Sequence, residues 1–283
     1  MVSHALAASL AASRPPWVDA ALLGILEGLT EFLPVSSTGH LVLLDSVLGH
    51  EGEAAKTLDI VIQLGAVLAV VVYFRERLAR LVVGVVRRRE EDLRLLTGLC
   101  VAFVPAAIVG LLLHKKIKAF LFGPVPVAAA LIVGGVAMLG IDVWLRKRPR
   151  PQHEGLPHVT TKRAVAVGLF QCLSLWPGAS RSMTTIVGGQ LSGLSTATAA
   201  EFSFLLAIPT LGAATLFDLA KGWRLLLNAP GGGVSLAVGL VVSFVVALAV
   251  VAGFLRYLRR YGLAPFGVYR IVLGAVVLLV ALR

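Results

Sequence analysis

The sequence predicts an all-α membrane protein that crosses the bilayer several times, and three observations support this fold class: composition, the length of the apolar runs, and two interrupted runs. Of the 283 residues, 58% are hydrophobic and 14% are charged, whereas a soluble globular domain carries about 25% charged residues. Apolar stretches of about twenty residues recur, which is enough for a helix to cross a hydrocarbon core about 30 Å thick. The composition therefore excludes a soluble two-domain protein.

Six of the apolar stretches have the length of full transmembrane helices. They cover residues 57–74, 94–113, 124–145, 197–217, 233–255 and 264–282. The sequence thus predicts a single membrane domain over residues 1–283 with six transmembrane helices.

Two further apolar stretches, 21–48 and 164–191, are interrupted near their middle. Pro34 begins the first interruption and Pro177 the second, and each arm of about ten to twelve residues is too short to span a bilayer. Irregular backbone at membrane depth is tolerated only where protein or a water-filled cavity surrounds it. Both stretches are therefore predicted to be re-entrant helical hairpins that mark a cavity.

The formal net charge of +11 resides in short clusters of Lys and Arg between the apolar runs. A nucleic-acid-binding protein needs a basic solvated face, so no nucleic-acid partner is predicted. If the loop after Phe74 is cytoplasmic, sixteen basic residues lie on the cytoplasmic side and eight on the outer side. The positive-inside rule favours this orientation. Both termini then face out, and the first 17 residues are predicted to be a flexible polar lead-in.

The two parts of the chain resemble each other at an offset of 144 residues. Gly24-x-x-Glu27 aligns with Gly168-x-x-Gln171, and the triplet 36–38 aligns with 180–182. Each half has one broken hairpin and three spans, and an odd number of spans inserts the second half upside down. We therefore predict an inverted-topology repeat. Its halves are 21–145 and 164–282, joined by the basic cytoplasmic loop 146–163.

The helices that follow the two breaks are predicted to point their N-termini at one place near the membrane midplane. Such N-termini bind anions through unpaired N–H groups and a positive dipole end, and Arg181 adds a fork that fits phosphate or carboxylate. The predicted ligand is a phosphorylated or otherwise strongly anionic head group, although ordinary helix capping also explains part of the hydroxyl pattern. The predicted substrate-binding residues are Ser36, Thr38, Gly178, Ser180, Ser182 and Thr185.

Titratable residues surround the first break. Glu27 and Glu31 are four residues apart and share a helix face, so a divalent cation, a held proton or an ion pair with Arg181 must neutralise them. His40 follows Ser37 by three residues and shares its face. This spacing favours proton transfer or activation of a nucleophile.

Two segments, Glu27 to His40 and Pro177 to Thr185, resemble the signature motifs of the undecaprenyl-diphosphate phosphatase family of the bacitracin-resistance type. The resemblance covers nearly the whole chain. It implies hydrolysis of undecaprenyl diphosphate to undecaprenyl phosphate and inorganic phosphate, which recycles the lipid carrier for cell-wall synthesis. It also implies a multi-pass protein of the bacterial inner membrane, among membrane lipid, with its active site open to the periplasmic or outer face.

The same resemblance implies a divalent-cation requirement, Mg²⁺ or Ca²⁺, with Glu27 and Glu31 as the acidic pair and metal ligands. It gives Ser37, His40 and Arg181 catalytic or phosphate-binding roles. Ser37 is the preferred nucleophile, with His40 as its base or as acid for the leaving group. Attack by His40 itself or by an activated water stays open at this point.

A secondary transporter or flippase for an anionic lipid or phosphate-bearing substrate is the alternative function, because inverted repeats and broken helices are typical of that class. The concentration of titratable side chains between Glu27 and His40 favours the hydrolase. The sequence gives no oligomeric state, and a homodimer stays open.

Overall fold

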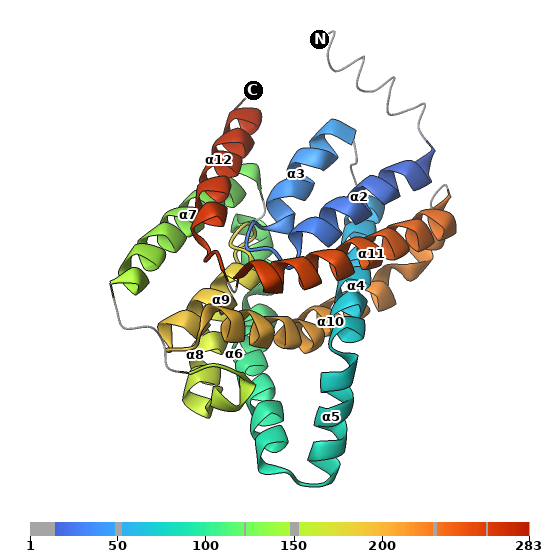
Figure 1. Cartoon of the computed structure of the whole chain (residues 1–283). Coiled ribbons are helices and arrows are strands. Elements are labelled where there is room, and N and C mark those ends of the chain that lie inside the picture. The colour runs from blue at the N-terminus through green and yellow to red at the C-terminus, as the bar shows by residue number, and fades with distance from the viewer. Residues whose placement is uncertain are drawn as a thin grey trace.

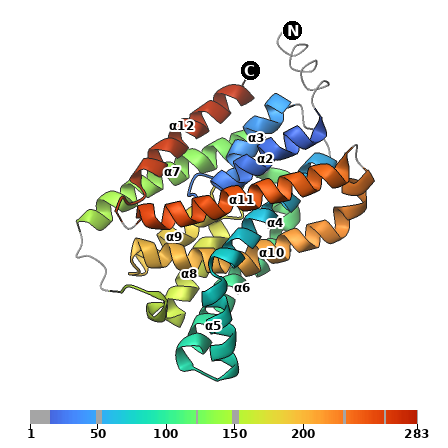
Figure 2. The ribbon, with the colours of Figure 1, turned by 45° about the vertical axis from the view of Figure 1, so that its right-hand side comes forward.

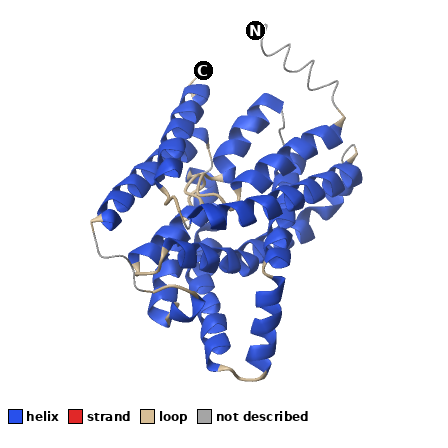
Figure 3. Ribbon diagram, viewed as in Figure 1, coloured by secondary structure: helices blue, strands red, loops and turns tan. Residues whose placement is uncertain are grey.

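The fold is known from a computed structural model that describes residues 15–48, 53–121, 123–147, 153–228, 231–258 and 260–282. Throughout these ranges the ordered elements are helices (Figure 3), apart from an isolated bridge between His153 and Leu194. The predicted all-α class is therefore confirmed. The first 14 residues of the predicted lead-in, and residues 148–152 of the predicted basic loop, lie outside the described ranges.

Figure 1 shows the helices in their order along the chain. The first half of the chain contains α2 (Pro16–Thr30), α3 (Ser37–Leu48), α4 (Glu53–Tyr73), α5 (Arg75–Val86), α6 (Glu90–Phe120) and α7 (Pro124–Arg146). After the 3₁₀ turn η1 (Leu156–His158), the second half contains α8 (Thr161–Leu173), α9 (Arg181–Leu191), α10 (Thr196–Asn228), α11 (Gly232–Leu258) and α12 (Ala264–Ala281).

Five of the predicted spans correspond to helices that are long and apolar enough to cross a membrane. Within the described residues these are Glu90–Leu113, Pro124–Arg146, Thr196–Leu225, Gly232–Leu258 and Ala264–Ala281. The predicted span 57–74 corresponds to the part of α4 at Thr57–Tyr73, which counts as a span only together with α5, across a bend of 70°. A multi-pass membrane protein is confirmed, with five or six spans by length and composition.

Both predicted interruptions are present. The helix α2 ends at Thr30 and α3 begins at Ser37, while α8 ends at Leu173 and α9 begins at Arg181. The residue before each new helix, Ser36 or Ser180, has a positive φ of 72° or 70°. This conformation is costly for a residue with a Cβ atom.

Each of these serines offsets part of that cost by capping the helix that follows it. The Ser36 hydroxyl accepts from the Gly39 N–H at 3.4 Å, and the Ser180 hydroxyl accepts from the Met183 N–H at 3.3 Å. Both satisfy a backbone donor that has no intrahelical partner. Helix capping therefore accounts for two of the predicted substrate-binding hydroxyls.

The two hairpins pack on opposite parts of the bundle. The helix α2 lies along α11, and α12 lies along α7 (Figures 1 and 2). The second hairpin packs through α8 on α6 and through α9 on α10. Beneath the breaks, Phe32 packs edge-on against Phe204 in the main apolar core, with ring centroids 5.1 Å apart. The two hairpins thus pack on different long helices of the bundle.

Candidate active site

The two breaks lie against each other, although about 145 residues separate them in the sequence. The Ser182 hydroxyl, at the start of α9, donates to the Leu33 carbonyl in the first break at 2.8 Å. The guanidinium of Arg270 on α12 donates to the carbonyls of Pro34 at 3.4 Å and Gly178 at 2.9 Å. These bonds fix the two irregular segments relative to each other.

The Glu31 carboxylate accepts hydrogen bonds from residues of both hairpins. Its Oε2 atom accepts from the Ser37 hydroxyl at 2.8 Å and from the Gln63 side-chain amide at 3.2 Å. Its Oε1 atom accepts from Nη2 of Arg181 at 3.3 Å. Glu31 and Arg181 are both buried, and removal of one partner from a buried ion pair typically costs about 3 to 5 kcal/mol. The Glu31–Arg181 ion pair therefore stabilises the contact between the two hairpins.

A second set of contacts orients Arg181. Its Nη1 atom donates to the Ser203 carbonyl at 3.1 Å and to the Ser203 hydroxyl at 3.3 Å, and its guanidinium lies 5.3 Å from the Phe32 ring centroid. Because the Thr185 hydroxyl donates to the Arg181 carbonyl at 2.7 Å, the Ser203 hydroxyl must donate to Thr185, at 2.6 Å. Thr185 was predicted to bind substrate, and the structure places it in the network that holds Arg181.

The Glu27 carboxyl is buried and incompletely satisfied. It is 2% exposed, and its Oε1 atom has no hydrogen-bond partner among the residues described. The side chains of Glu31 and Asp59 lie near enough to repel its charge, and Gln63 is also beside it. A buried carboxylate oxygen without a partner is costly, so the acidic pair has the donor chemistry that suits a divalent cation.

The described residues hold no group of three or more His, Cys, Asp or Glu side chains that is arranged to bind a metal ion. Magnesium sites that act on phosphates commonly use only one or two carboxylates, and phosphate oxygens and water supply the other ligands. Glu27 and Glu31 fit that arrangement. The chain therefore offers two carboxylates and leaves most of the coordination to a ligand.

His40 and Ser37 have different partners. The Nδ1 atom of His40 lies 2.7 Å from the Ser36 carbonyl oxygen, and its Nε2 atom lies 2.6 Å from the hydroxyl of Tyr269 on α12. The predicted shared face of α3 does not produce a bond between Ser37 and His40. The turn after α2 brings Glu31 back to the first residue of α3, so the Ser37 hydroxyl meets that carboxylate.

The remaining predicted substrate-binding residues differ in their availability. Ser182 is fully buried and bonded to Leu33, and the hydroxyl of Ser180 lies 3.0 Å from that of Ser182. Gly178 has φ of +95°, and a Cβ atom there would lie 2.6 Å from the Val127 carbonyl oxygen. Thr38 is partly exposed on α3. Ser182 and Gly178 therefore shape the site, whereas Thr38 faces outward enough to meet a ligand.

Sequence reasoning missed four residues that contact the site. They are Gln63 on α4, Ser203 on α10, and Tyr269 and Arg270 on α12. For Arg270 a signal was present, because an arginine within the apolar run 264–282 is expensive in a membrane and usually functional. Gln63, Ser203 and Tyr269 are unremarkable polar residues within helices and gave no comparable signal.

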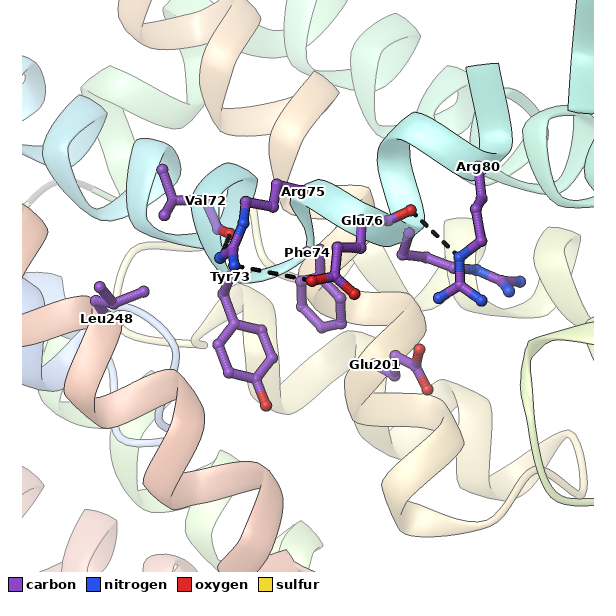
Figure 4. A pocket seen from close by; sticks show the side chains of 9 residues that line it. Val72, Tyr73, Phe74, Arg75, Glu76, Arg80, Glu201 and Leu248 are labelled. Atoms are coloured by element: carbon purple, nitrogen blue, oxygen red, sulfur yellow. Dashed lines mark hydrogen bonds and ion pairs between the residues drawn. The ribbon is translucent and has the colours of Figure 1, made fainter. Parts of the chain in front are cut away.

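A cavity of about 490 Å³ lies at the junction of α4 and α5, away from the two breaks. Figure 4 shows Arg75, Glu76, Arg80 and Glu201 around it, with Arg75 and Glu76 forming an ion pair at 3.8 Å. None of the predicted site residues lines this cavity. The candidate catalytic groups therefore gather at the paired breaks, where polar side chains are buried.

Comparison with known proteins identifies relatives of nearly the whole chain. A sequence model of the family described as "Bacitracin resistance protein BacA" matches residues 20–276, which include both breaks. A protein of Sorangium cellulosum (strain So ce56) named undecaprenyl-diphosphatase is 72% identical over 262 residues. That alignment covers 93% of this chain and 85% of the relative.

Proposed function

The chain belongs to the bacitracin resistance protein BacA family, and from this premise we propose that it hydrolyses undecaprenyl diphosphate to undecaprenyl phosphate and inorganic phosphate. The observation that carries the proposal is the hydrogen bond from the Ser37 hydroxyl to Glu31, at 2.8 Å, with Arg181 on the other oxygen of that carboxylate. A hydroxyl that donates to a carboxylate, beside a phosphate-binding arginine, is the arrangement of an activated nucleophile.

The proposed reaction proceeds in two steps on Ser37. Its oxygen attacks the terminal phosphorus and its proton passes to Glu31. The bond from that phosphorus to the bridging oxygen breaks as His40 gives a proton to that oxygen, which releases undecaprenyl phosphate. Water then attacks the phosphorus of the phosphoserine, and the bond from phosphorus to the Ser37 oxygen breaks. That oxygen takes back the proton held by Glu31, and the freed carboxylate accepts a proton from the attacking water and later loses it to solvent. Inorganic phosphate is released and the Ser37 hydroxyl is restored. Arg181 and the N-terminal N–H groups of α3 and α9 offset the negative charge of the phosphoryl group.

Glu27 and Glu31 would hold a divalent cation, which would supply positive charge to offset that of the diphosphate. The support is the buried Glu27 oxygen that has no hydrogen-bond partner in the described part of the chain. Glu31 also accepts from Ser37, so it links the acidic pair to the nucleophile.

The paired contacts of Ser37 and Glu31 favour hydrolysis over the transporter alternative. Binding and moving an anion requires positive charge and N–H donors, and Arg181 with two helix N-termini would suffice. A hydroxyl in contact with a buried carboxylate adds nothing to anion affinity, since the carboxylate repels the ligand. In hydrolysis both groups have a role, since the Ser37 hydroxyl attacks phosphorus and the Glu31 carboxylate accepts its proton.

We also propose that the fold is an inverted-topology repeat of the halves 21–145 and 164–282. In support, α2 packs on α11 as α8 packs on α6, and α4 packs on α11 as α10 packs on α6. A Cβ atom at Gly24 would lie 2.7 Å from the Gly239 carbonyl oxygen, and one at the aligned Gly168 would lie 2.7 Å from that of Ala102. Each hairpin thus packs through an aligned glycine on the matching helix of the other half.

The proposed orientation follows the basic residues of the connecting segments, of which sixteen lie inside and eight outside when the α5 region is cytoplasmic. The chain would then reside in the bacterial inner membrane with the first hairpin entered from the outer side. The active site would open to the periplasmic or outer face, where the isoprenoid tail lies along apolar helix faces.

The test is phosphate release from farnesyl diphosphate by detergent-purified protein, with and without a chelator. We expect cation-dependent release that Glu31→Gln and Arg181→Ala abolish, and acid quench should trap phosphate on Ser37. Binding of the diphosphate without release would support the transporter. Single-turnover release with ¹⁸O from water and no trapped adduct would instead assign attack to water.

A further inference from the structure

The imidazole of His40 is held at both nitrogens. The Ser36 carbonyl oxygen, 2.7 Å from Nδ1, only accepts hydrogen bonds, so Nδ1 carries a hydrogen. In the neutral ring Nε2 is then the lone-pair nitrogen, and the Tyr269 hydroxyl at 2.6 Å must donate to it. The two rings are also stacked, with centroids 5.6 Å apart and 12° between their planes. One tautomer and one ring orientation are therefore selected.

The position of Tyr269 is itself fixed. The next residue, Arg270, is fully buried and donates to the carbonyls of Pro34, Ala130 and Gly178. These bonds tie α12 to both breaks and to α7, and they set the register of α12 against α3. The Tyr269 side chain is 46% exposed, so the pair it forms with His40 lies at an open edge of the site that a ligand can approach.

We propose that Tyr269 is a positioning residue for the hydrolysis reaction, which acts through His40. Its hydroxyl donates to Nε2 of the neutral imidazole and, by rotating, accepts from the same nitrogen when the ring is protonated. Tyr269 thus gives His40 a partner in both protonation states and keeps Nε2 as the nitrogen that exchanges a proton. This inference rests on the proposed hydrolysis only for its kinetic consequence, since the tautomer assignment stands on the contacts alone.

The test uses Tyr269→Phe, which keeps the stacked ring and removes only the hydroxyl. We expect kcat for farnesyl diphosphate to fall about two- to tenfold with KM within twofold, as the loss of one hydrogen bond predicts. In a His40→Ala background, Tyr269→Phe should cause no further loss. Tyr261→Phe, which changes an exposed tyrosine elsewhere, is the matched control and should leave kcat unchanged.

A second readout does not depend on activity. In protein with ¹⁵N-labelled histidine, the ring nitrogens of His40, assigned by comparison with His40→Ala, should report a hydrogen on Nδ1 in the wild type. Tyr269→Phe should broaden or shift these signals, and Tyr261→Phe should not.

Three outcomes would overturn the proposal: an Nε2-protonated ring in the wild type, His40 signals unchanged in Tyr269→Phe, or equal losses from Tyr269→Phe with and without His40. Failure of the wild type to release phosphate would overturn the proposed function instead, and it would leave the tautomer result to stand by itself.

Discussion

The two broken hairpins have similar backbone conformations, but their charged side chains are of opposite sign. Each ends in a serine of positive φ, Ser36 or Ser180, whose hydroxyl caps the helix that follows. At the offset of 144 residues, the acidic residues Glu27 and Glu31 align with Gln171 and Leu175. Ser37 and His40 align with Arg181 and Thr184. The first hairpin thus contributes the carboxylates and the proposed nucleophile, and the second contributes the cationic group.

This difference indicates how the proposed repeat would form an asymmetric active site. The shared serine geometry gives both halves a helix N-terminus directed at the same region. The diverged positions then meet across the interface, where the Arg181 guanidinium of one half reaches the Glu31 carboxylate of the other at 3.3 Å. Two hairpins with identical side chains would offer only two helix N-termini to an anion. The side chains that differ between the hairpins supply the groups of the proposed reaction.

The largest expected effect comes from Ser37, the proposed nucleophile in the first hairpin. Ser37→Ala should lower kcat by about 10⁴-fold, because no other hydroxyl in the described part of the chain donates to Glu31. The measurement is phosphate release from farnesyl diphosphate, with binding checked by calorimetry. Ser192→Ala, at the far end of α9, is the control and should lie within twofold of wild type. If Ser37→Ala kept an activity within tenfold of wild type, water and not Ser37 would be the group that attacks phosphorus.

Glu31→Gln should lower kcat by about 10³-fold, since a neutral amide neither accepts the Ser37 proton nor pairs with Arg181. The same phosphate-release assay applies. Glu76→Gln, a neutralised carboxylate on α5 far from the breaks, should leave turnover unchanged. If the two variants behaved alike, Glu31 would have no role in proton transfer and the two hairpins would differ less than we infer.

On the second hairpin, Arg181→Lys should lower kcat by about 10²-fold, because lysine keeps the charge but loses the planar fork that contacts both Glu31 and Ser203. Comparison of kcat and KM between wild type and variant measures the effect. Arg224→Lys on α10 serves as the conservative control. Full activity in Arg181→Lys would mean that only the charge matters at this position.

The smallest effect is expected at Ser182, which aligns with Thr38 but bonds to the Leu33 carbonyl. Ser182→Ala should lower the free energy of unfolding by about 1 kcal/mol and turnover by less than tenfold, because it removes one buried hydrogen bond. Thermal unfolding in detergent reports the first quantity and phosphate release the second. Unchanged stability together with a loss like that of Ser37→Ala would instead place Ser182 on the substrate.

Local physical chemistry made much of the fold predictable from sequence. A helix that crosses hydrocarbon needs about twenty apolar residues, so five spans are visible in hydropathy alone. Pro34 and Pro177 each lie within an interrupted apolar stretch, and both interruptions exist in the structure. The 70° bend between α4 and α5 was not predicted. The sequence there runs from an apolar helix directly into an arginine-rich one, with no proline or glycine at the junction.

The sequence by itself also determined which residues are the candidates for the chemistry, because carboxylates, a histidine and an arginine in apolar segments are costly and usually functional. Only the tertiary structure decided which of them meet. Spacing along one helix predicted that Ser37 and His40 share a face. In the structure the Ser37 hydroxyl instead donates to Glu31 across the turn, and the His40 ring contacts the Tyr269 hydroxyl on α12. Helical periodicity defines neighbours within one element, whereas a break redirects the chain and packing brings in partners from distant segments.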